Sequence, residues 1–430
     1  MRVPGTATRR PAEAAIDPTI PPQRLGRALV ALFATACGLS VACITFAEPL
    51  LDSIADEFGI SHAAVGTVTT VTQVGYGLGL LLLVPLGDLA DRRRLIATHT
   101  ILASAALLVV AGARTAPVLF VAFAAIGIFA VVTQILVAHA ALLAGPAERG
   151  RVVGLVTSGV ITGILLARAI SGTLADLLGW RAVYLVASGA MFVVALLLLA
   201  SVPPGPRPAS ALTYPKLLQS TATLFVEVPI LRVRAVLAGL IFASNTILWT
   251  PLVLPLTREP FSLTRTEVGL FGLAGVAGAI GAAAAGRLAD RGLVQRTTAV
   301  GLLLMIVAWL PIFLMQATLG FLALGALAIS FGLQAVHVSN QSLIYMTRPD
   351  ARSRLVAGYM IFYSIGSAVG AAVSTLVYAR AGWPGVCLAG CAVSVAAMVF
   401  WWLTRHVASD AAVNPSVEDR AAPAKSDCQA

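Results

Sequence analysis

The sequence contains few charged residues for its length. Asp, Glu, Lys and Arg make up 11% of its 430 residues, whereas about a quarter of an ordinary soluble domain is charged. This scarcity excludes a soluble globular protein. A disordered chain is also excluded, because disorder requires low hydrophobicity and this chain is 58% apolar, with a mean hydropathy of +0.91. The composition is that of a membrane protein.

Several other features are missing, and each absence excludes a class of function. No tract of Lys and Arg with interleaved aromatics is present, so the net charge of +10 does not indicate a nucleic-acid partner. The five cysteines have no metal-type or redox-type spacing, and no metal site is expected. Neither Lys216 nor Lys425 follows a glycine, so the phosphate-binding loop of an ATP-driven pump is absent. The histidines are scattered and form no cluster with carboxylates, so we expect no catalytic residues and no enzyme.

The sequence does contain many long apolar runs. A helix needs about 20 apolar residues to cross a bilayer, and the length of the chain accommodates about twelve such spans. We predict six spans before a polar, Pro-rich stretch and six after it. They lie near residues 28–51, 63–86, 95–113, 116–143, 152–177 and 182–203, then 235–256, 267–286, 297–316, 319–344, 354–379 and 384–404.

The basic residues set the predicted orientation. If both termini lie inside, the inner segments hold 23 of the 29 Lys and Arg residues, the outer loops hold five, and Arg168 falls within a span. The positive-inside rule therefore predicts cytoplasmic termini. The resulting segments are tails at 1–27 and 405–430, six-helix bundles at 28–203 and 235–404, and a cytoplasmic linker at 204–234 in which Tyr214 to Glu227 can form a short surface helix.

The two halves repeat each other. The run Gly87-Asp88-Leu89-Ala90-Asp91-Arg92 recurs 199 residues later as Gly286-Arg287-Leu288-Ala289-Asp290-Arg291, with five of six positions identical. Pro49-Leu50 pairs with Pro251-Leu252 at a similar offset. Because six is an even number of spans, both copies enter the membrane from the same side. The sequence therefore predicts an all-α membrane protein of twelve transmembrane helices in two parallel six-helix repeats.

The loop after the second span resembles that of the major facilitator superfamily. The family pattern Gly-x-Leu-Ala-Asp-Arg is matched from Gly87 to Arg92, although the second glycine of the full pattern is missing. The run that begins at Glu48-Pro49 further resembles the bacterial sugar-efflux and drug-efflux permease branch. The resemblance implies a multi-pass protein of the bacterial inner membrane that moves a small molecule by alternating access. It also implies a functional monomer that needs no cofactor and draws on a proton gradient.

The same resemblance implies a cytoplasmic gate. In the family this loop acts as a conformational latch, in which Asp91 would meet a helix N-terminus of the opposite half and Arg92 would pair with a carboxylate. The alternative is a short turn whose charges only anchor the spans. The gating candidates are Gly87, Asp91, Arg92, Gly286, Asp290 and Arg291.

Arg168 and Glu48 are the candidate charged residues of the transport pathway. An ionisable side chain within a span is costly and indicates function, so Arg168 should face the cavity or a partner. The alternatives are snorkelling to an interface and a purely structural ion pair. Glu48 lies late in the first span, where it is either a proton-titrating carboxylate, which could pair with Arg168, or a solvated residue at a helix end. In the fifth span of family antiporters a proline precedes the paired glycines, and Arg168 stands in its place.

Other polar and aromatic residues fall on one face of their spans and favour a mostly neutral, aromatic-lined cavity. Hydrogen bonds between helices are the alternative for each of them. They are Gln73, Tyr76, Gln134, Asn245, Trp249, Gln334 and His337.

The predicted function is secondary active transport, with proton-coupled export of a small organic compound such as a drug, antibiotic, sugar or metabolite. The alternative within transporters is proton-coupled uptake by symport. The alternative from another class is a membrane channel or a non-transporting receptor.

Overall fold

In a computed structural model, residues 26–61, 63–144, 148–203, 213–345, 347 and 352–413 are described, and their regular elements are all helical. The predicted N-terminal tail up to residue 25, the linker residues 204–212 and the tail from residue 414 lie outside the described residues. The first half contains α1 (Arg27–Thr45), η1 (Glu48–Leu50), α2 (Leu51–Phe58), α3 (Thr67–Leu82), η2 (Val84–Asp88), α4 (Arg92–Gly112), α5 (Ala116–Ala130), α6 (Val132–Leu143), α7 (Arg149–Leu178) and α8 (Trp180–Ser201).

The connecting helix α9 spans Tyr214–Glu227, where the sequence predicts a short helix. The second half contains α10 (Pro229–Trp249), α11 (Val253–Leu256), α12 (Arg265–Leu270), η3 (Phe271–Ala274), α13 (Gly275–Asp290), α14 (Val294–Phe313), η4 (Leu314–Gln316), α15 (Leu319–Tyr345) and α16 (Arg352–Val413).

The predicted fold class is confirmed. Within the described residues, eleven helical stretches are long and apolar enough to cross a membrane, and the last of them, Arg354–Val407, has 54 residues. At about 1.5 Å per residue this stretch is far longer than a hydrocarbon core of about 30 Å. It is interrupted at Gly382, whose φ of 61° and ψ of −160° are not helical. Gly382 is therefore the turn between two spans, which makes twelve crossings.

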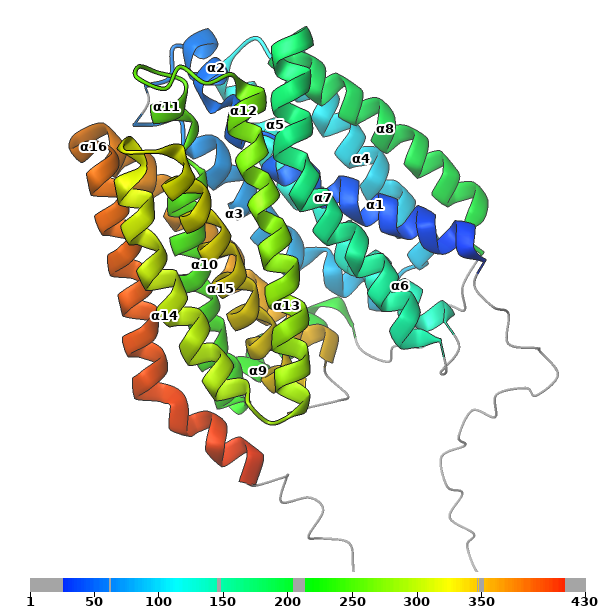
Figure 1. The fold of residues 1–430 in the computed structure, drawn as a ribbon. Coiled ribbons are helices and arrows are strands. Elements are labelled where there is room, and N and C mark those ends of the chain that lie inside the picture. The colour runs from blue at the N-terminus through cyan, green and yellow to red at the C-terminus, as the bar shows by residue number, and fades with distance from the viewer. Residues whose placement is uncertain are drawn as a thin grey trace, which may run out of the picture.

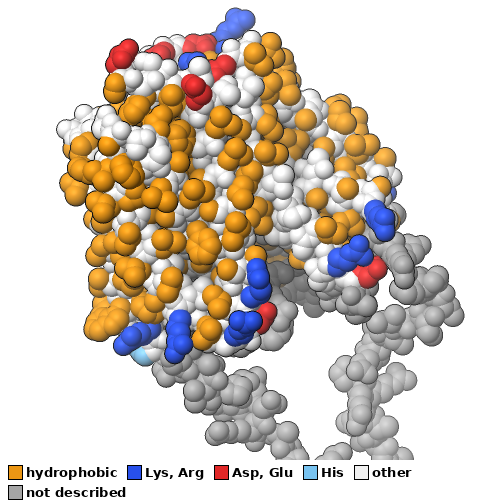
Figure 2. All heavy atoms as spheres, viewed as in Figure 1, with side chains coloured by type: hydrophobic (Ala, Val, Ile, Leu, Met, Phe, Trp, Pro, Cys, Tyr) orange, Lys and Arg blue, Asp and Glu red, His pale blue; other side chains and the backbone are white. Residues whose placement is uncertain are grey.

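The helices form two bundles that lie side by side (Figure 1). We call the end of the molecule that carries α9 the linker end, and the opposite end, which carries α2 and α11, the far end. Between the two ends, apolar side chains cover the visible surface (Figure 2). Leu177, Val121 and Leu388 are about 70% exposed, as expected for side chains that face lipid rather than water.

Proline breaks the first span of each half at the same place. α1 ends at Thr45, four residues before Pro49, because a proline ring clashes with the carbonyl four residues earlier. The first span of the second half breaks in the same way between Trp249 and Val253, around Pro251. Interrupted helices at corresponding positions of two repeats are typical of transporter binding sites.

Glycines allow a close contact between α1 and α7 in the first half. α1 packs along α7, and a side chain at Gly163 would collide with the backbone of Gly38, as one at Gly159 would with Ala34. This contact accounts for the stripe of small residues that the sequence places every fourth position along the fifth span.

Several helix ends differ from the sequence boundaries, and those of α10 and α16 extend the furthest beyond them. α10 begins at Pro229, six residues before the predicted start of its span, because proline at the first helical position leaves no N–H unsatisfied. Arg234, assigned to the linker from sequence, is therefore inside a helix and only 1% exposed. α16 continues to Val413, past the predicted end at residue 404.

Candidate functional site

A cavity of about 120 Å³ lies between the two bundles, and we call it the inner cavity. It is bordered by residues from α1, α3 and α7 of the first half and from α10, α13, α15 and α16 of the second. Six of the residues predicted for the pathway meet there. They are Glu48, Gln73, Arg168, Asn245, Trp249 and Gln334.

An ion pair forms the charged part of the inner cavity. Arg168 Nε donates a hydrogen bond to Glu48 Oε2, although the two residues are 120 positions apart in the chain. Both are buried, at 8% and 9% exposure. The Arg168 guanidinium also lies over the Trp249 ring, with Cζ 4.3 Å from the ring centroid. Arg168 therefore does not snorkel, and Glu48 is not a solvated helix end.

The local backbone explains why these groups meet. The proline break places Glu48 in η1, off the axis of α1, and the matching break in the second half places Trp249 at the last residue of α10. On the other side, Gly269 and Gly272 lack side chains where Arg168 passes. A side chain at Gly269 would collide with the Arg168 carbonyl, and a Cβ at Gly272 would lie 2.9 Å from the Arg168 Cβ.

Amide side chains supply the neutral polar surface of the inner cavity. Trp249 Nε1 donates to Asn245 Oδ1 at 3.2 Å, which fixes the indole on its own helix. Gln73 is only 7% exposed, and its Oε1 atom has no hydrogen-bond partner among the described residues. A buried acceptor without a partner is costly, so Gln73 is available to a ligand that carries a hydrogen-bond donor.

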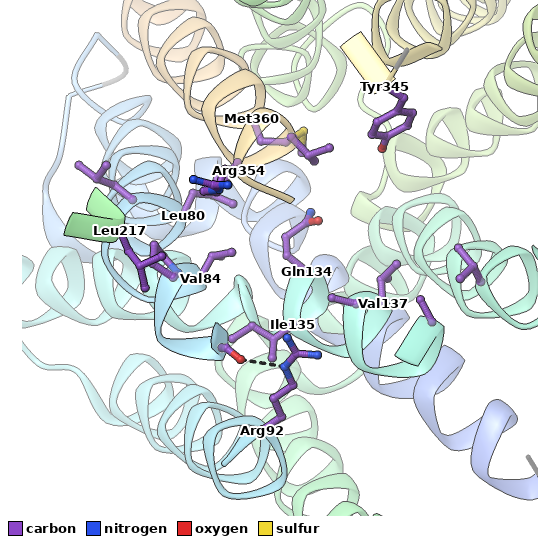
Figure 3. A pocket seen from close by; sticks show the side chains of 18 residues that line it. Leu80, Val84, Arg92, Gln134, Ile135, Val137, Leu217, Tyr345, Arg354 and Met360 are labelled. Atoms are coloured by element: carbon purple, nitrogen blue, oxygen red, sulfur yellow. Dashed lines mark hydrogen bonds between the residues drawn. The ribbon is translucent and has the colours of Figure 1, made fainter. Parts of the chain in front are cut away.

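A larger cavity of about 400 Å³, the outer cavity, lies toward the linker end (Figure 3). Its walls are mostly apolar and come from both halves and from Leu217 of α9. The predicted pathway residue Gln134 points into it, and Arg92 and Arg354 lie at its border (Figure 3).

Two tyrosines from opposite halves connect residues that line the two cavities. Tyr363, on α16, lines the inner cavity, and its ring meets that of Tyr76 edge to face with centroids 6.1 Å apart. Gln134 Nε2 donates to the Tyr76 hydroxyl at 3.4 Å. The predicted residues Tyr76 and Gln134 therefore do not line the inner cavity, and Gln134 lines the outer cavity instead.

His337 does not line the inner cavity; it packs behind the lining residue Phe242 and belongs to a polar cluster of the second half. Its Nδ1 atom is 2.9 Å from the Tyr359 hydroxyl, to which Asn340 Nδ2 also donates at 3.5 Å. Arg234 Nη1 donates to Asn340 Oδ1 at 3.3 Å, while its Nε and Nη2 atoms have no partner among the described residues.

The loop after the second span makes contacts within its own half. Asp91 is the N-cap of α4 and accepts a hydrogen bond from the Arg93 N–H at 2.9 Å. Arg92 Nε donates to the carbonyl of Gly87 at 2.7 Å (Figure 3). The described Asp91 contacts do not include the predicted one to a helix of the opposite half. In the second repeat, Asp290 and Arg291 are exposed, and Gly286 has open space around it.

The far end is closed by contacts between the halves. Asp176, on α7, accepts hydrogen bonds from the Thr266 N–H and Oγ1, both at 2.7 Å, in the first turn of α12. Arg265 Nη1 lies 3.6 Å from the same carboxylate, and its Nε donates to Ser53 Oγ at 2.7 Å. α7 and α12 can cross closely because Gly172 has no side chain. A side chain at this position would collide with the Arg265 carbonyl.

The sequence matches the profile of the Major Facilitator Superfamily over residues 28–255 and 234–426. The chain belongs to this superfamily. A putative uncharacterized transporter of Escherichia coli K12, YgaY, is 45% identical over 388 residues, which cover 90% of this chain and 98% of YgaY. The probable transporter SCO4007 of Streptomyces coelicolor is 32% identical over 395 residues, covering 89% and 87% of the two chains.

Solved structures share the fold of this superfamily member. An inward-facing, occupied bacterial homologue of the human lysosomal transporter Spinster superimposes with a TM-score of 0.71 at 17% identity, covering 92% of this chain and 98% of the homologue. The human organic anion transporter MFSD10 superimposes with a TM-score of 0.64 at 20% identity, covering 87% and 99%. The superfamily member described here is thus a multi-pass membrane transporter and not an enzyme.

Three contacts of this superfamily member were not predicted from the sequence. Tyr363 lies four positions after Tyr359 on its span, and the sequence does not indicate its tertiary contact with Tyr76. Asp176 carries no motif, because its partners at Thr266 are 90 residues away. Arg234 could have been placed within a helix from Pro229, since proline is frequent at the first helical position.

Proposed function

We propose that the protein is a proton-coupled secondary transporter that moves a small organic compound by alternating access. The observation that carries this proposal is the buried Glu48–Arg168 pair in a cavity between the halves, at the point where the first span of each half is broken. Glu48 is the proton-titrating carboxylate, the proton gradient is the energy source, and a single chain contains the whole site.

The linker end is assigned to the cytoplasm. Lys and Arg side chains gather at this end of the visible face (Figure 2), as the positive-inside rule requires of cytoplasmic loops. The outer cavity then opens toward the cytoplasm, while Asp176 and Thr266 hold the far end closed. This arrangement corresponds to the inward-facing half of a transport cycle.

Two directions of transport are candidates. Export is favoured by the likeness of the region around Glu48 and Pro49 to sugar-efflux and drug-efflux permeases. Uptake by symport is favoured by Arg168, which stands where family antiporters carry a proline. The relatives and structural neighbours named above do not decide between these directions, since they support transport in general.

The test is proton movement in proteoliposomes that contain the purified protein and a pH-sensitive dye. A panel of sugars, amphiphilic drugs, antibiotics and small acids is added in turn under an imposed pH gradient. At least one compound should drive proton movement, and Glu48→Gln should abolish the response. If labelled compounds cross the membrane without protons, the coupling is wrong; a substrate-gated current of channel size would favour a channel.

A further inference from the structure

Three charged side chains are buried in the part of the chain that the structure describes, namely Glu48, Arg168 and Arg234. Only Glu48 and Arg168 line the inner cavity, and they neutralise each other. A substrate that carries a charge must replace one member of this pair, because a third charge beside an intact pair has no partner. The protonation chemistry of the two side chains decides which member the substrate replaces.

The two members of the pair are not equivalent. A carboxylate loses its charge when it takes up one proton, whereas a guanidinium cannot be deprotonated in a protein. Glu48 is therefore the member that can be neutralised, and Arg168 is the member that is then left with an uncompensated charge. A buried charge without a partner is strongly unfavourable. An anion that arrives at Arg168 removes this penalty.

The surroundings of Glu48 contain no second cation to take the place of Arg168 among the described contacts. On α12, Arg265 is bound by Asp176 and Ser53, and Glu267 caps its own helix at Thr264. The acidic groups of α2 point to other partners or solvent: Glu57 binds Trp180 and Arg181, Asp56 is exposed, and Asp52 is partly exposed. Tyr363, on α16, is the other titratable group that faces the inner cavity.

The shape of the site limits the anion. One face of the Arg168 guanidinium is covered by Trp249, and the Nε edge is occupied by Glu48. A replacement ligand must approach in the plane of the guanidinium, as a planar carboxylate does. On the wall of the same cavity, the Gln73 Oε1 atom, which has no partner among the described residues, can accept a hydrogen bond from the ligand. The cavity of about 120 Å³ leaves room for a small organic group between its aromatic side chains.

We propose that the substrate is a small organic acid with one carboxylate and a hydrogen-bond donor, and that it moves together with one proton in the same direction. The proton adds to Glu48, the hydrogen bond from Arg168 to Glu48 breaks, and the substrate carboxylate binds Arg168 in its place. The net charge of the site is the same before and after. This inference rests on the proposed function and selects symport over antiport.

The test uses the full-length protein in proteoliposomes with an internal pH-sensitive dye and no initial pH gradient. The probes are small monocarboxylic acids, including hydroxy acids, with their amides and amines of matched size as controls. An inward gradient of a substrate acid should acidify the interior beyond the leak of protein-free vesicles, while the matched amides and amines should not. Arg168→Lys should lower the protein-dependent flux by about tenfold or more.

Two variants separate coupling from folding. In Glu48→Gln the side chain mimics the neutral acid, so exchange of labelled acid across the membrane should continue while proton movement stops. The matched control is Glu57→Gln, which removes the carboxylate that binds Arg181 within the first half. This variant should keep both the exchange of labelled acid and the proton movement. If Glu48→Gln fails to fold, the direction of proton movement in the unmodified protein still decides between symport and antiport.

The outcomes separate this inference from the proposed function. Protons that move against the substrate, or responses confined to neutral or cationic compounds, overturn the acidic substrate and the symport but leave a proton-coupled transporter. If no compound of any charge drives protein-dependent proton movement, both the inference and the proposed function are overturned.

Discussion

At the scale of single residues, the Glu48–Arg168 pair is the feature with the largest energetic consequence. Bringing two charges out of water costs several kcal/mol per ion, and only their mutual attraction and further hydrogen bonds offset this cost. Here the offset comes from the hydrogen bond between the two side chains and from the Trp249 ring. Such a pair contributes little net stability, but breaking it is costly.

Arg168→Gln should destabilise the protein by about 3–5 kcal/mol, because it leaves the Glu48 carboxylate buried without its cation. The double variant Glu48→Gln/Arg168→Gln should recover most of this loss, since neither charge remains. Thermal melting of the detergent-solubilised protein, followed by size-exclusion chromatography, measures both. Equal melting temperatures for the single variant and the unmodified protein would show that the pair is not buried in the folded protein.

The contact between Tyr76 and Tyr363 should control access to the inner cavity from the linker end. Edge-to-face aromatic pairs contribute about 0.5–1.5 kcal/mol, so Tyr363→Ala should raise the accessibility of the cavity by about two- to tenfold. The measurement is the rate at which a maleimide labels Gln334→Cys, a cavity-lining position. Tyr378→Ala, on the same helix and outside the cavity lining, is the matched control. An unchanged labelling rate would assign the tyrosines to packing alone.

At the scale of helices, the crossing of α7 and α12 determines whether the far end can close. Gly172→Leu places a side chain against the Arg265 backbone, which cannot yield as a flexible side chain could. We expect transport to fall by about tenfold or more, as core overpacking of about 1–3 kcal/mol would produce. The maleimide should then reach Gln334→Cys from the far end.

Gly154→Leu is the control for this prediction, because Gly154 lies on the same helix with open space around it. It should transport at the normal rate. Normal transport by Gly172→Leu as well would mean that the far end does not close by this helix contact.

The helices were largely predictable from sequence, because a span needs only a long apolar run and the loop after the second span of each half carries the same residues. The breaks were less predictable. Pro49 and Pro251 were recognised as a repeated pair, but the periodicity of an apolar run does not reveal that α1 ends at Thr45. Glu48 and Asp52 are four positions apart, yet they do not share one α-helix, because Glu48 lies in η1 and Asp52 in α2.

The individual residues of the candidate site were predictable from the sequence, but the contacts between them were not. An ionisable residue within a span is conspicuous, so Arg168 and Glu48 could be named from sequence. Their contact joins positions 120 residues apart, and the crossing of α1 with α7 that brings them together depends on glycines in both helices. His337 shows the opposite case, since its polar spacing matches that of cavity residues although it binds Tyr359 within its own half.

At the scale of the whole molecule, closure of the far end and the cavity at the linker end belong to one conformation. Asp176 caps the first turn of α12 across the two halves, whereas Asp91, near the linker end, caps a helix of its own half. Alternating access requires this relation to reverse. When the linker end closes, the Asp91 loop must approach the second half, and the Asp176 contacts must break.

Asp91→Asn should abolish transport while leaving substrate binding intact. Asparagine is as good an N-cap as aspartate, so the substitution keeps the cap of α4 and removes only the negative charge that would meet a helix N-terminus of the other half. The measurements are flux in proteoliposomes and binding of a labelled substrate in detergent. Asp290→Asn, at the repeated and exposed position, should lower flux far less. Parallel loss of binding and flux in Asp91→Asn would assign Asp91 to the stability of α4, because a latch acts on the change between conformations and not on the site that either conformation presents.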